Sequence, residues 1–228
     1  MGTTAVSVCI PTFEAHGRAI ELLSRSFDML KKQTFKDFEV VVSDNSDNDD
    51  IKNFCERPEY ASLNIKYSKN PRKGISANTN EAIRAASGKL IKILYMDDFL
   101  SGENSLKEVV DNFKGHWLVT ACAHSEKNGK IMKPHFPSFN NKLKMGENTI
   151  GSPSVLAITN ENPLWFNENL TWVLDCDYYQ RLYEKYGEPT VLNNINVIIG
   201  LGKHQTTKHL GFWEKRKEIK YMKKKYHE

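Results

Sequence analysis

The segment Leu90-Ile91-Lys92-Ile93-Leu94-Tyr95-Met96-Asp97-Asp98-Phe99 joins an apolar run to a pair of carboxylates. The run has the composition of a buried strand, and Asp97 and Asp98 follow its end. Ligands of open α/β sheets bind outside the carboxyl ends of the strands, where paired carboxylates are suitable ligands for Mg²⁺ or Mn²⁺ carrying a diphosphate. The pattern predicts chemistry on a nucleotide-linked substrate, although such a pair on its own is more typical of a solvated turn.

Other apolar runs alternate with helical patterns. Strands are predicted at residues 6–10, 38–42, 63–67 and 89–94, and helices at about 15–33 and 75–86. Because these runs are continuously apolar, we expect a mostly parallel sheet with helices on both faces, which is an α/β fold. After Asp98 the regular alternation of predicted strands and helices ends. Helices are predicted at about 105–113 and 178–186, strands at 117–123, 154–159 and 191–199, and a loop at 134–150.

The composition fits one soluble domain. The chain has 228 residues, of which 26% are charged and 39% hydrophobic. No run reaches the 18 apolar residues of a membrane span, and the N-terminus lacks the features of a signal peptide, so we expect a cytoplasmic location. The four cysteines lie far apart without a CxxC pair, which argues against a zinc site and against a disulfide framework.

The net charge of +4 is concentrated at the C-terminus, where residues 203–228 hold nine Lys or Arg and three Glu. The rest of the chain is nearly neutral, which argues against nucleic acid as a partner. In the basic tail, residues 208–228, aromatic and apolar side chains alternate with lysines at the spacing of an amphipathic helix. Such a helix suits an anionic membrane surface, and docking on the domain or on a second subunit of a homo-oligomer is an equal alternative.

The chain contains several short motifs that, in this order, resemble those of the family 2 glycosyltransferases of the GT-A fold. VSVCIPTFE (6–14) and QTFKDFEVVVSD (33–44) resemble the first two strands of that family. NPRKGISANTN (70–80) and ASGKLI (86–91) then lead to Asp97-Asp98. The second half contributes GSPS (151–154), FNENL (166–170) and DCDYYQRL (175–182). The likeness covers roughly residues 5–207.

The resemblance implies an inverting enzyme with a Rossmann-like, mostly parallel central sheet. Residues 1–207 would form the domain, with a nucleotide-binding half (1–100) and an acceptor-binding half (101–207), followed by the tail 208–228. The expected donor is a nucleotide sugar, most often a UDP-hexose or UDP-N-acetylhexosamine. The expected acceptor is a hydroxyl of a glycan or lipid-linked glycan in cell-surface polysaccharide synthesis, and the cofactor is Mn²⁺ or Mg²⁺.

Residues at the predicted strand ends are the candidates for binding the nucleotide. They are Pro11, Thr12, Phe13, Glu14, Asp44 and Asp97. In the family the position of Asp44 accepts the imino proton of uracil, while a turn cap is the structural alternative. Phe13 either packs on the base or belongs to the core.

Charged residues further along are candidates for the diphosphate and the metal. Lys73, Asn80 and also Arg72 are candidate donor contacts, although a solvated loop suits Arg72 equally. The resemblance makes Asp98 the direct metal ligand and Asp97 a contact of the ribose or of metal-bound water. It makes His204 a third metal ligand or a phosphate contact, although a lone loop histidine is more often neither.

The sequence departs from the family at three positions: Tyr95 stands where an earlier Asp is common, Thr79 where Arg is common, and Leu174 where Glu is common. The first departure puts a second sugar or ribose contact in doubt.

The resemblance aligns Asp175 with the catalytic base of the family. A carboxylate there can take the proton of the attacking acceptor hydroxyl, and apolar neighbours such as Leu174 or Trp172 would raise its pKa toward that task. Asp175 as a helix cap, and Asp177 as the base, are the alternatives. Trp172 either stacks on the acceptor sugar or belongs to the core.

Two other functions compete with glycosyl transfer. A nucleotidyltransferase needs a glycine-rich triphosphate loop near the N-terminus, and residues 11–17 do not form one. A non-catalytic nucleotide-sugar-binding or scaffold protein is favoured only by the three departures, and the presence of both Asp98 and Asp175 argues against it.

Overall fold

A computed structural model describes residues 4–125, 131, 134–202, 205 and 209–227. Within this part of the chain, eight strands form one sheet in the order β3-β2-β1-β4-β7-β6-β8-β5. The strands are β1 (Val6–Thr12), β2 (Phe38–Asp44), β3 (Ile65–Lys69), β4 (Leu90–Ile93), β5 (Phe99–Leu100), β6 (Trp117–Ser125), β7 (Leu156–Thr159) and β8 (Thr190–Gly200).

The sheet is mostly parallel, as the sequence predicts. β1 pairs in parallel with β2 and β4, β2 with β3, and β6 with β8. Two strands run the other way: β7, inserted between β4 and β6, and the short β5 at the edge beside β8. The insertion of β7 joins the regular N-terminal half to the second half in one continuous sheet.

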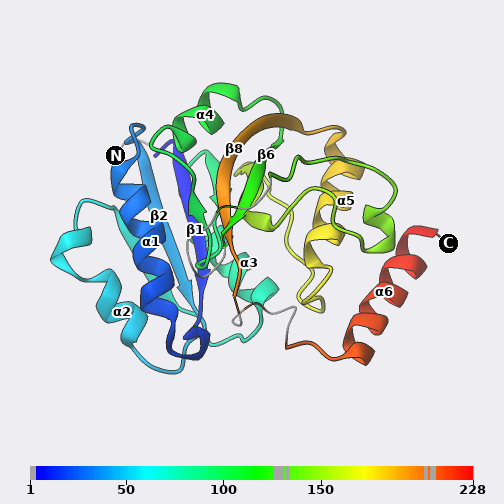
Figure 1. The fold of residues 1–228 in the computed structure, drawn as a ribbon, viewed down its shortest axis with the longest axis horizontal. Helices are drawn as coiled ribbons and strands as arrows, with labels where there is room; N and C mark the ends of the chain where they lie inside the picture. The colour runs from blue at the N-terminus through cyan, green and yellow to red at the C-terminus, as the bar shows by residue number, and fades with distance from the viewer. Residues whose placement is uncertain (1–3, 126–130, 132–133, 203–204, 206–208, 228) are drawn as a thin grey trace.

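Helices cover both faces of the sheet. They are α1 (Ala19–Lys32), α2 (Asp50–Cys55), α3 (Ile75–Ala85), α4 (Ser105–Asn112), α5 (Leu174–Tyr186) and α6 (Phe212–His227). The connections β1-α1-β2 and β2-α2-β3 step one way along the sheet and β3-α3-β4 steps back. Right-handed crossovers therefore put α1 and α2 on one face and α3 on the other (Figure 1). The expectation of a doubly covered α/β sheet is confirmed.

Several predicted boundaries are wrong. The predicted helix at 15–33 is a 3-10 turn, Ala15–Gly17, followed by α1, because Ala15 and His16 adopt positive φ angles of 47° and 54°. α2 and β5 were not predicted, since the first is short and polar and the second has two residues. α5 begins at Leu174 rather than at 178, which places Asp175 inside its first turn.

α6 packs against the rest of the protein. Met222 on this helix is fully buried, and the helix lies beside the 3-10 turn Leu143–Met145. Docking on the domain, one of the two interpretations of the basic tail, is therefore what the structure shows. Among the described residues, no helix combines the length and the apolar character needed to cross a bilayer.

Candidate active site

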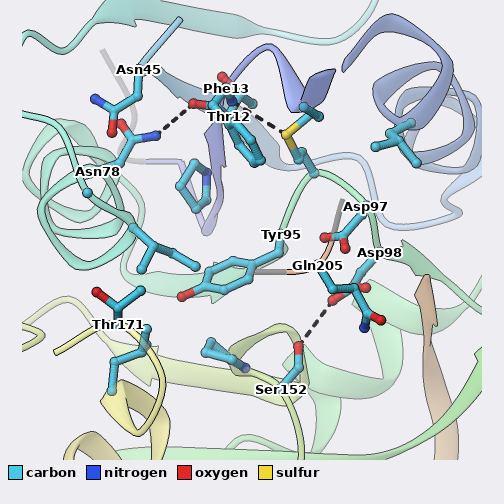
Figure 2. A pocket seen from close by; sticks show the side chains of 18 of the residues that line it. Thr12, Phe13, Asn45, Asn78, Tyr95, Asp97, Asp98, Ser152, Thr171 and Gln205 are labelled. Carbon is cyan, nitrogen blue, oxygen red and sulfur yellow. Dashed lines mark hydrogen bonds between the residues drawn. The ribbon is translucent and has the colours of Figure 1, made fainter. Parts of the chain in front are cut away.

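A cavity of about 750 Å³ opens where the carboxyl ends of β1 and β4 meet the second half of the chain. Parallel pairing sets Thr12 of β1 opposite Asp44 of β2, so these strands end together. Most of the predicted site residues line this cavity: Pro11, Thr12, Phe13, Glu14, Lys73, Asp97, Asp98 and Asp175. Thr12, Phe13, Asp97 and Asp98 are labelled in Figure 2.

Asp98 is held rigidly in the wall. The backbone N–H of Gly200 donates to its Oδ1 at 2.9 Å, and Ser152 Oγ donates to its Oδ2 at 3.1 Å (Figure 2). Its side chain is almost fully buried, and burial together with the charge of Asp97 raises the pKa of Asp98 to about 8. Such a raised pKa means that the local environment does not balance the negative charge.

Asp97 and Asp98 fit a divalent cation. Both supply hard carboxylate oxygens at the cavity, the donor type that Mg²⁺ and Mn²⁺ prefer. A cation there would offset the two causes of the raised pKa of Asp98, which are its burial and the neighbouring charge of Asp97. Among the described residues, no cluster of three or more acidic, His or Cys side chains has metal-binding geometry. His204, the predicted third ligand, lies outside the residues that the structure describes.

A buried lysine lies behind this wall. Lys92 of β4 donates from Nζ to the backbone carbonyls of Ile93, at 3.0 Å, and of Ser154. Burial lowers its pKa to about 7, and the nearby carboxylate of Asp98 opposes that change.

Asp175 faces the cavity from the first turn of α5. Asn148 Nδ2 donates to its Oδ2 at 2.6 Å, and the backbone N–H of Cys176 donates to its Oδ1 at 2.7 Å. Burial raises its pKa to about 6, close to the value that suits a base at neutral pH. Leu174 and Trp172 also line the cavity and provide the expected apolar surroundings.

Asp177, the alternative base, is fully buried and does not line the cavity. Its carboxylate pairs with Arg181 Nε at 2.8 Å and with Lys225 Nζ at 2.6 Å, and it accepts a hydrogen bond from Tyr226 at 2.8 Å. Because Asp177 is buried away from the cavity and paired with two cations, it links α5 to α6 and does not face a substrate.

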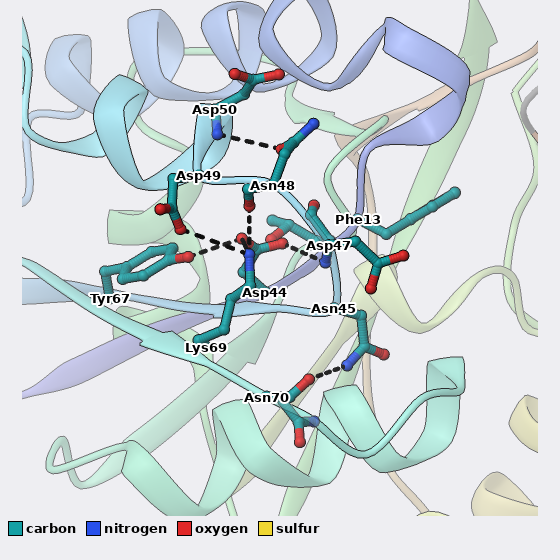
Figure 3. Close-up of polar contacts among 12 residues, drawn as sticks. Phe13, Asp44, Asn45, Asp47, Asn48, Asp49, Asp50, Tyr67, Lys69 and Asn70 are labelled. Atoms are coloured by element: carbon teal, nitrogen blue, oxygen red, sulfur yellow. Dashed lines mark hydrogen bonds and ion pairs between the residues drawn. The ribbon is translucent and has the colours of Figure 1, made fainter.

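Asp44 is fully buried at the end of β2 and is not among the residues that line the cavity. Tyr67 donates to its Oδ2 at 2.8 Å, the N–H of Ser46 donates to its Oδ1 at 2.8 Å, and Lys69 Nζ lies 3.5 Å away (Figure 3). The turn cap, the alternative considered for this residue, matches these contacts. Its neighbours Asn45 and Asp47 line the cavity instead.

Asn80 and Arg72 also lie outside the cavity lining. Asn80 exchanges two hydrogen bonds with the backbone of Phe166, at 2.7 and 2.9 Å, and so ties α3 to the loop before α5. Arg72 forms ion pairs with Glu168 and Glu81, each at 3.2 Å. These side chains connect the loops around the site, and they are not among the residues that line the cavity.

Other predicted contacts do reach the cavity. Lys73 Nζ lies 2.6 Å from the carbonyl of Asn45 and 2.5 Å from Asp47, at the rim. Phe13 is 37% exposed, so its ring is available for stacking rather than buried in the core. Lys215 of α6 lies 5.5 Å above the ring of Trp172, which connects the C-terminal helix to the cavity wall.

The unpredicted polar residues of the cavity lining include Asn45, Asn78, Asn148, Ser152 and Gln205. Asn78 lies in the 70–80 motif and donates to the carbonyl of Thr12 at 2.9 Å, so the motif was a signal for it. Asn148 lies in an irregular loop without a local pattern. The two departures at Tyr95 and Thr79 meet in space, with their hydroxyl oxygens 3.4 Å apart.

Comparisons with known proteins agree with this geometry. The Staphylococcus aureus protein TarS, residues 1–349, in complex with UDP-GlcNAc has a TM-score of 0.67 at 18% identity, over 96% of this chain and 66% of that one. The mannosyltransferase PcManGT from Pyrobaculum calidifontis, in complex with GDP-Man and Mn²⁺, has a TM-score of 0.58 at 16% identity, over 92% of this chain and 60% of that one. The fold is therefore that of the GT-A glycosyltransferases.

The chain belongs to glycosyl transferase family 2, whose model matches residues 7–160. A curated relative, the GalNAc(5)-diNAcBac-PP-undecaprenol beta-1,3-glucosyltransferase of Campylobacter jejuni, is 32% identical over 131 residues. That match covers 56% of this chain and 41% of the relative, so the chain corresponds to less than half of that enzyme.

Proposed function

We propose that this protein is an inverting glycosyltransferase that moves a sugar from a UDP-sugar, a hexose or N-acetylhexosamine, to a hydroxyl of a lipid-linked glycan in cell-surface polysaccharide synthesis. The observation that carries the proposal is that Asp97-Asp98 and Asp175, from separate halves of the chain, line one cavity. A site with a diphosphate-binding pair and a poised carboxylate base suits glycosyl transfer to a hydroxyl.

On the donor side, Thr12, Phe13 and Asn45 would hold the nucleoside, and Lys73 would contact the diphosphate. Carboxylates outnumber cations among the described lining residues, with Glu14, Asp47, Asp97, Asp98 and Asp175 against Lys73. A diphosphate is repelled by such a surface unless a cation is bound with it. Mn²⁺ or Mg²⁺ at Asp98 and Asp97 would neutralise the charge that develops on the leaving diphosphate.

On the acceptor side, the acceptor hydroxyl oxygen would attack the anomeric carbon as the bond from that carbon to the nucleoside diphosphate breaks. The hydroxyl proton passes to Asp175, and the nucleoside diphosphate leaves with the bonding electron pair. Asn148 and the N–H of Cys176 hold the carboxylate in one orientation for this transfer. Attack on the face opposite the leaving group inverts the anomeric configuration.

Names of related proteins support the substrate classes. The Campylobacter jejuni relative is named for a glycan on undecaprenyl diphosphate, and TarS complexes contain UDP or UDP-GlcNAc. The PcManGT structure contains GDP-Man and Mn²⁺. We therefore favour a UDP-sugar, a lipid-linked acceptor and a divalent metal for this chain as well.

A lipid-linked acceptor lies at a membrane, and the outer face of α6 suits an anionic membrane surface. Phe212 and Trp213 at the start of this helix are 70% and 74% exposed. Basic residues follow on the exposed side: Arg216, Lys217, Lys220, Lys223 and Lys224. We propose that this face lies on the membrane, with the protein peripheral to it.

A thermal-shift panel with UDP, GDP, dTDP and CDP, each with and without Mn²⁺, tests the donor side. A nucleotide at about 100 times its dissociation constant stabilises by about 2.7 kcal/mol, or roughly 5–10 °C in this size range. We expect a shift with UDP that depends on Mn²⁺. Asp98→Asn should lose the Mn²⁺-dependent part, and Asp111→Asn, which removes an exposed carboxylate of α4, should keep it.

Two results would contradict the proposal. If no nucleotide shifts the melting temperature, the cavity is not a nucleotide site, and a scaffold role gains support. If Asp98→Asn keeps the full Mn²⁺-dependent shift, the metal assignment is wrong.

A further inference from the structure

Three backbone N–H groups just before α5 converge on one side chain of α6. The Glu218 carboxylate accepts hydrogen bonds from the N–H of Thr171 at 2.9 Å, of Trp172 at 2.8 Å and of Val173 at 2.9 Å. Glu218 is only 9% exposed, so water cannot easily replace it. An anion at the N-terminal end of a helix is also favoured by the helix dipole.

A second contact fixes α6 on the other side of Asp175. Lys225 Nζ lies 2.6 Å from Asp177 Oδ1, and the Tyr226 hydroxyl donates to the same oxygen at 2.8 Å. Asp177 is two residues beyond Asp175, and Val173 is two residues before it. α6 therefore holds the chain on both sides of the candidate base.

Between these two contacts, α6 also supports the loop that orients the base. Gly146 has φ +78°, and a Cβ added there would lie 2.6 Å from Ile219 Cδ1 and 3.1 Å from Val173 Cγ1. This close approach packs the loop ending at Asn148 against α6. Asn148 in turn donates to Asp175, so the helix contacts every segment that sets the position of this carboxylate.

We propose that α6 is a brace for the acceptor side of the site, and that Glu218 is a positioning residue acting through residues 171–173 on Trp172 and Asp175. The inference rests on the proposed function, in which Asp175 takes the acceptor proton. Loss of Glu218 would leave three N–H groups without their partner and loosen the first turn of α5. Small displacements of a catalytic group can cost about 100-fold in rate.

The proposed brace predicts different effects on transfer to the acceptor and on binding of the nucleotide. The Glu218 carboxylate bonds to residues 171–173, whereas Thr12, Lys73 and Asp98 line the donor side of the cavity. Weakening the brace should therefore reduce transfer to the acceptor while nucleotide binding stays the same.

The test uses the full chain with Glu218→Ala and Glu218→Gln, and with Glu214→Gln as the matched control. Glu214 lies one turn earlier on α6 and accepts a hydrogen bond from the N–H of Gly211. We expect amide exchange at residues 171–173 to be at least tenfold faster in Glu218→Ala and intermediate in Glu218→Gln. Transfer to a lipid-linked glycan acceptor should fall about 10- to 100-fold in kcat/KM for the acceptor, with UDP–Mn²⁺ affinity within twofold of wild type.

The outcomes separate the brace from the proposed function. Unchanged exchange at 171–173 in Glu218→Ala would overturn the brace, and so would an equal loss of nucleotide affinity, which indicates general damage. Unchanged acceptor kinetics despite faster exchange would also overturn it. If the wild type transfers no sugar while exchange responds as expected, the proposed function fails, and the link from Glu218 to residues 171–173 stands on exchange alone.

Discussion

At the scale of single residues, the pKa of Asp175 links the structure to a measurable property. Burial raises this pKa to about 6, and a base must be deprotonated to accept the acceptor proton. We expect the logarithm of kcat/KM for the acceptor to rise with unit slope below about pH 6 and to flatten above it. A pH–rate profile of kcat/KM for the acceptor, with donor and metal saturating, measures this pKa in the enzyme before the acceptor binds.

Asp175→Asn provides the control for this profile. Removal of a general base costs typically 10²- to 10⁴-fold in rate, and the remaining activity should no longer show the step near pH 6. Asp177→Asn is unsuitable as a matched control, because it removes the partner of Arg181 and Lys225. A profile that keeps the same step in Asp175→Asn would assign it to another group.

Single residues also show where sequence patterns are insufficient. Asp97 and Asp98 follow a recognisable strand, and Asp175 was assigned by its resemblance to the family; the structure places all three in the lining of one cavity. Asp44 and Asn80 lie in motifs that resemble the family as clearly. In the structure, however, they form hydrogen bonds with Tyr67 and Phe166, which are distant in the sequence. Local patterns do not contain such partners, so a buried, satisfied side chain cannot be distinguished from a ligand contact.

At the scale of elements, the end of β8 approaches the acidic turn after β4 closely. The N–H of Gly200 donates to Asp98, and a Cβ at Gly200 would collide with the carbonyl oxygen of Asp97. Gly200→Ala must therefore displace this turn, at a cost of about 1–3 kcal/mol. We expect a melting temperature lower by roughly 2–12 °C and a strongly reduced Mn²⁺-dependent shift with UDP.

Gly102→Ala is the matched control, because nothing lies within 4 Å of a Cβ at that position. Differential scanning fluorimetry of both variants, with and without UDP and Mn²⁺, makes the comparison. Equal behaviour of the two variants would mean that β8 does not constrain the acidic turn.

The elements also differ in how well the sequence predicted them. Strands β1, β2 and β4 are continuous apolar runs, and their predicted positions agree closely with the structure. The start of α5 was placed four residues late, because Leu174-Asp175-Cys176-Asp177 has no clear amphipathic pattern. The N–H groups just before it bond to Glu218, 45 residues or more further along the chain, so the helix start depends on tertiary contacts.

At the scale of the whole molecule, one side of α6 packs on the domain and the other side is exposed. Ile219, Met222 and Tyr226 pack on the domain, so they cannot also enter a bilayer. What remains for a membrane is the aromatic pair Phe212 and Trp213 with the exposed basic residues. The amphipathic pattern predicted a two-sided helix correctly, but it could not show which side the domain covers.

Co-sedimentation with vesicles tests this surface on the full chain. We expect binding to phosphatidylcholine vesicles that contain phosphatidylglycerol, and weak binding to phosphatidylcholine alone, because each basic residue near an anionic surface contributes about 1 kcal/mol. Binding should fall steeply as salt rises. Trp213→Ala should reduce partitioning by about tenfold or more, since burying one large apolar side chain is worth about 1.5–3 kcal/mol.

Trp165→Ala is the matched control, since Trp165 is 43% exposed and stacks with Arg84, a residue of α3 rather than of α6. Equal losses in the two tryptophan variants would show that exposed aromatic area in general, and not the start of α6, drives the binding. Equal binding to neutral and anionic vesicles would remove the role of the basic residues. A loss confined to Trp213→Ala, with unchanged UDP–Mn²⁺ affinity, would locate the membrane contact beside the acceptor wall, because Lys215 on the same turn of α6 lies over Trp172.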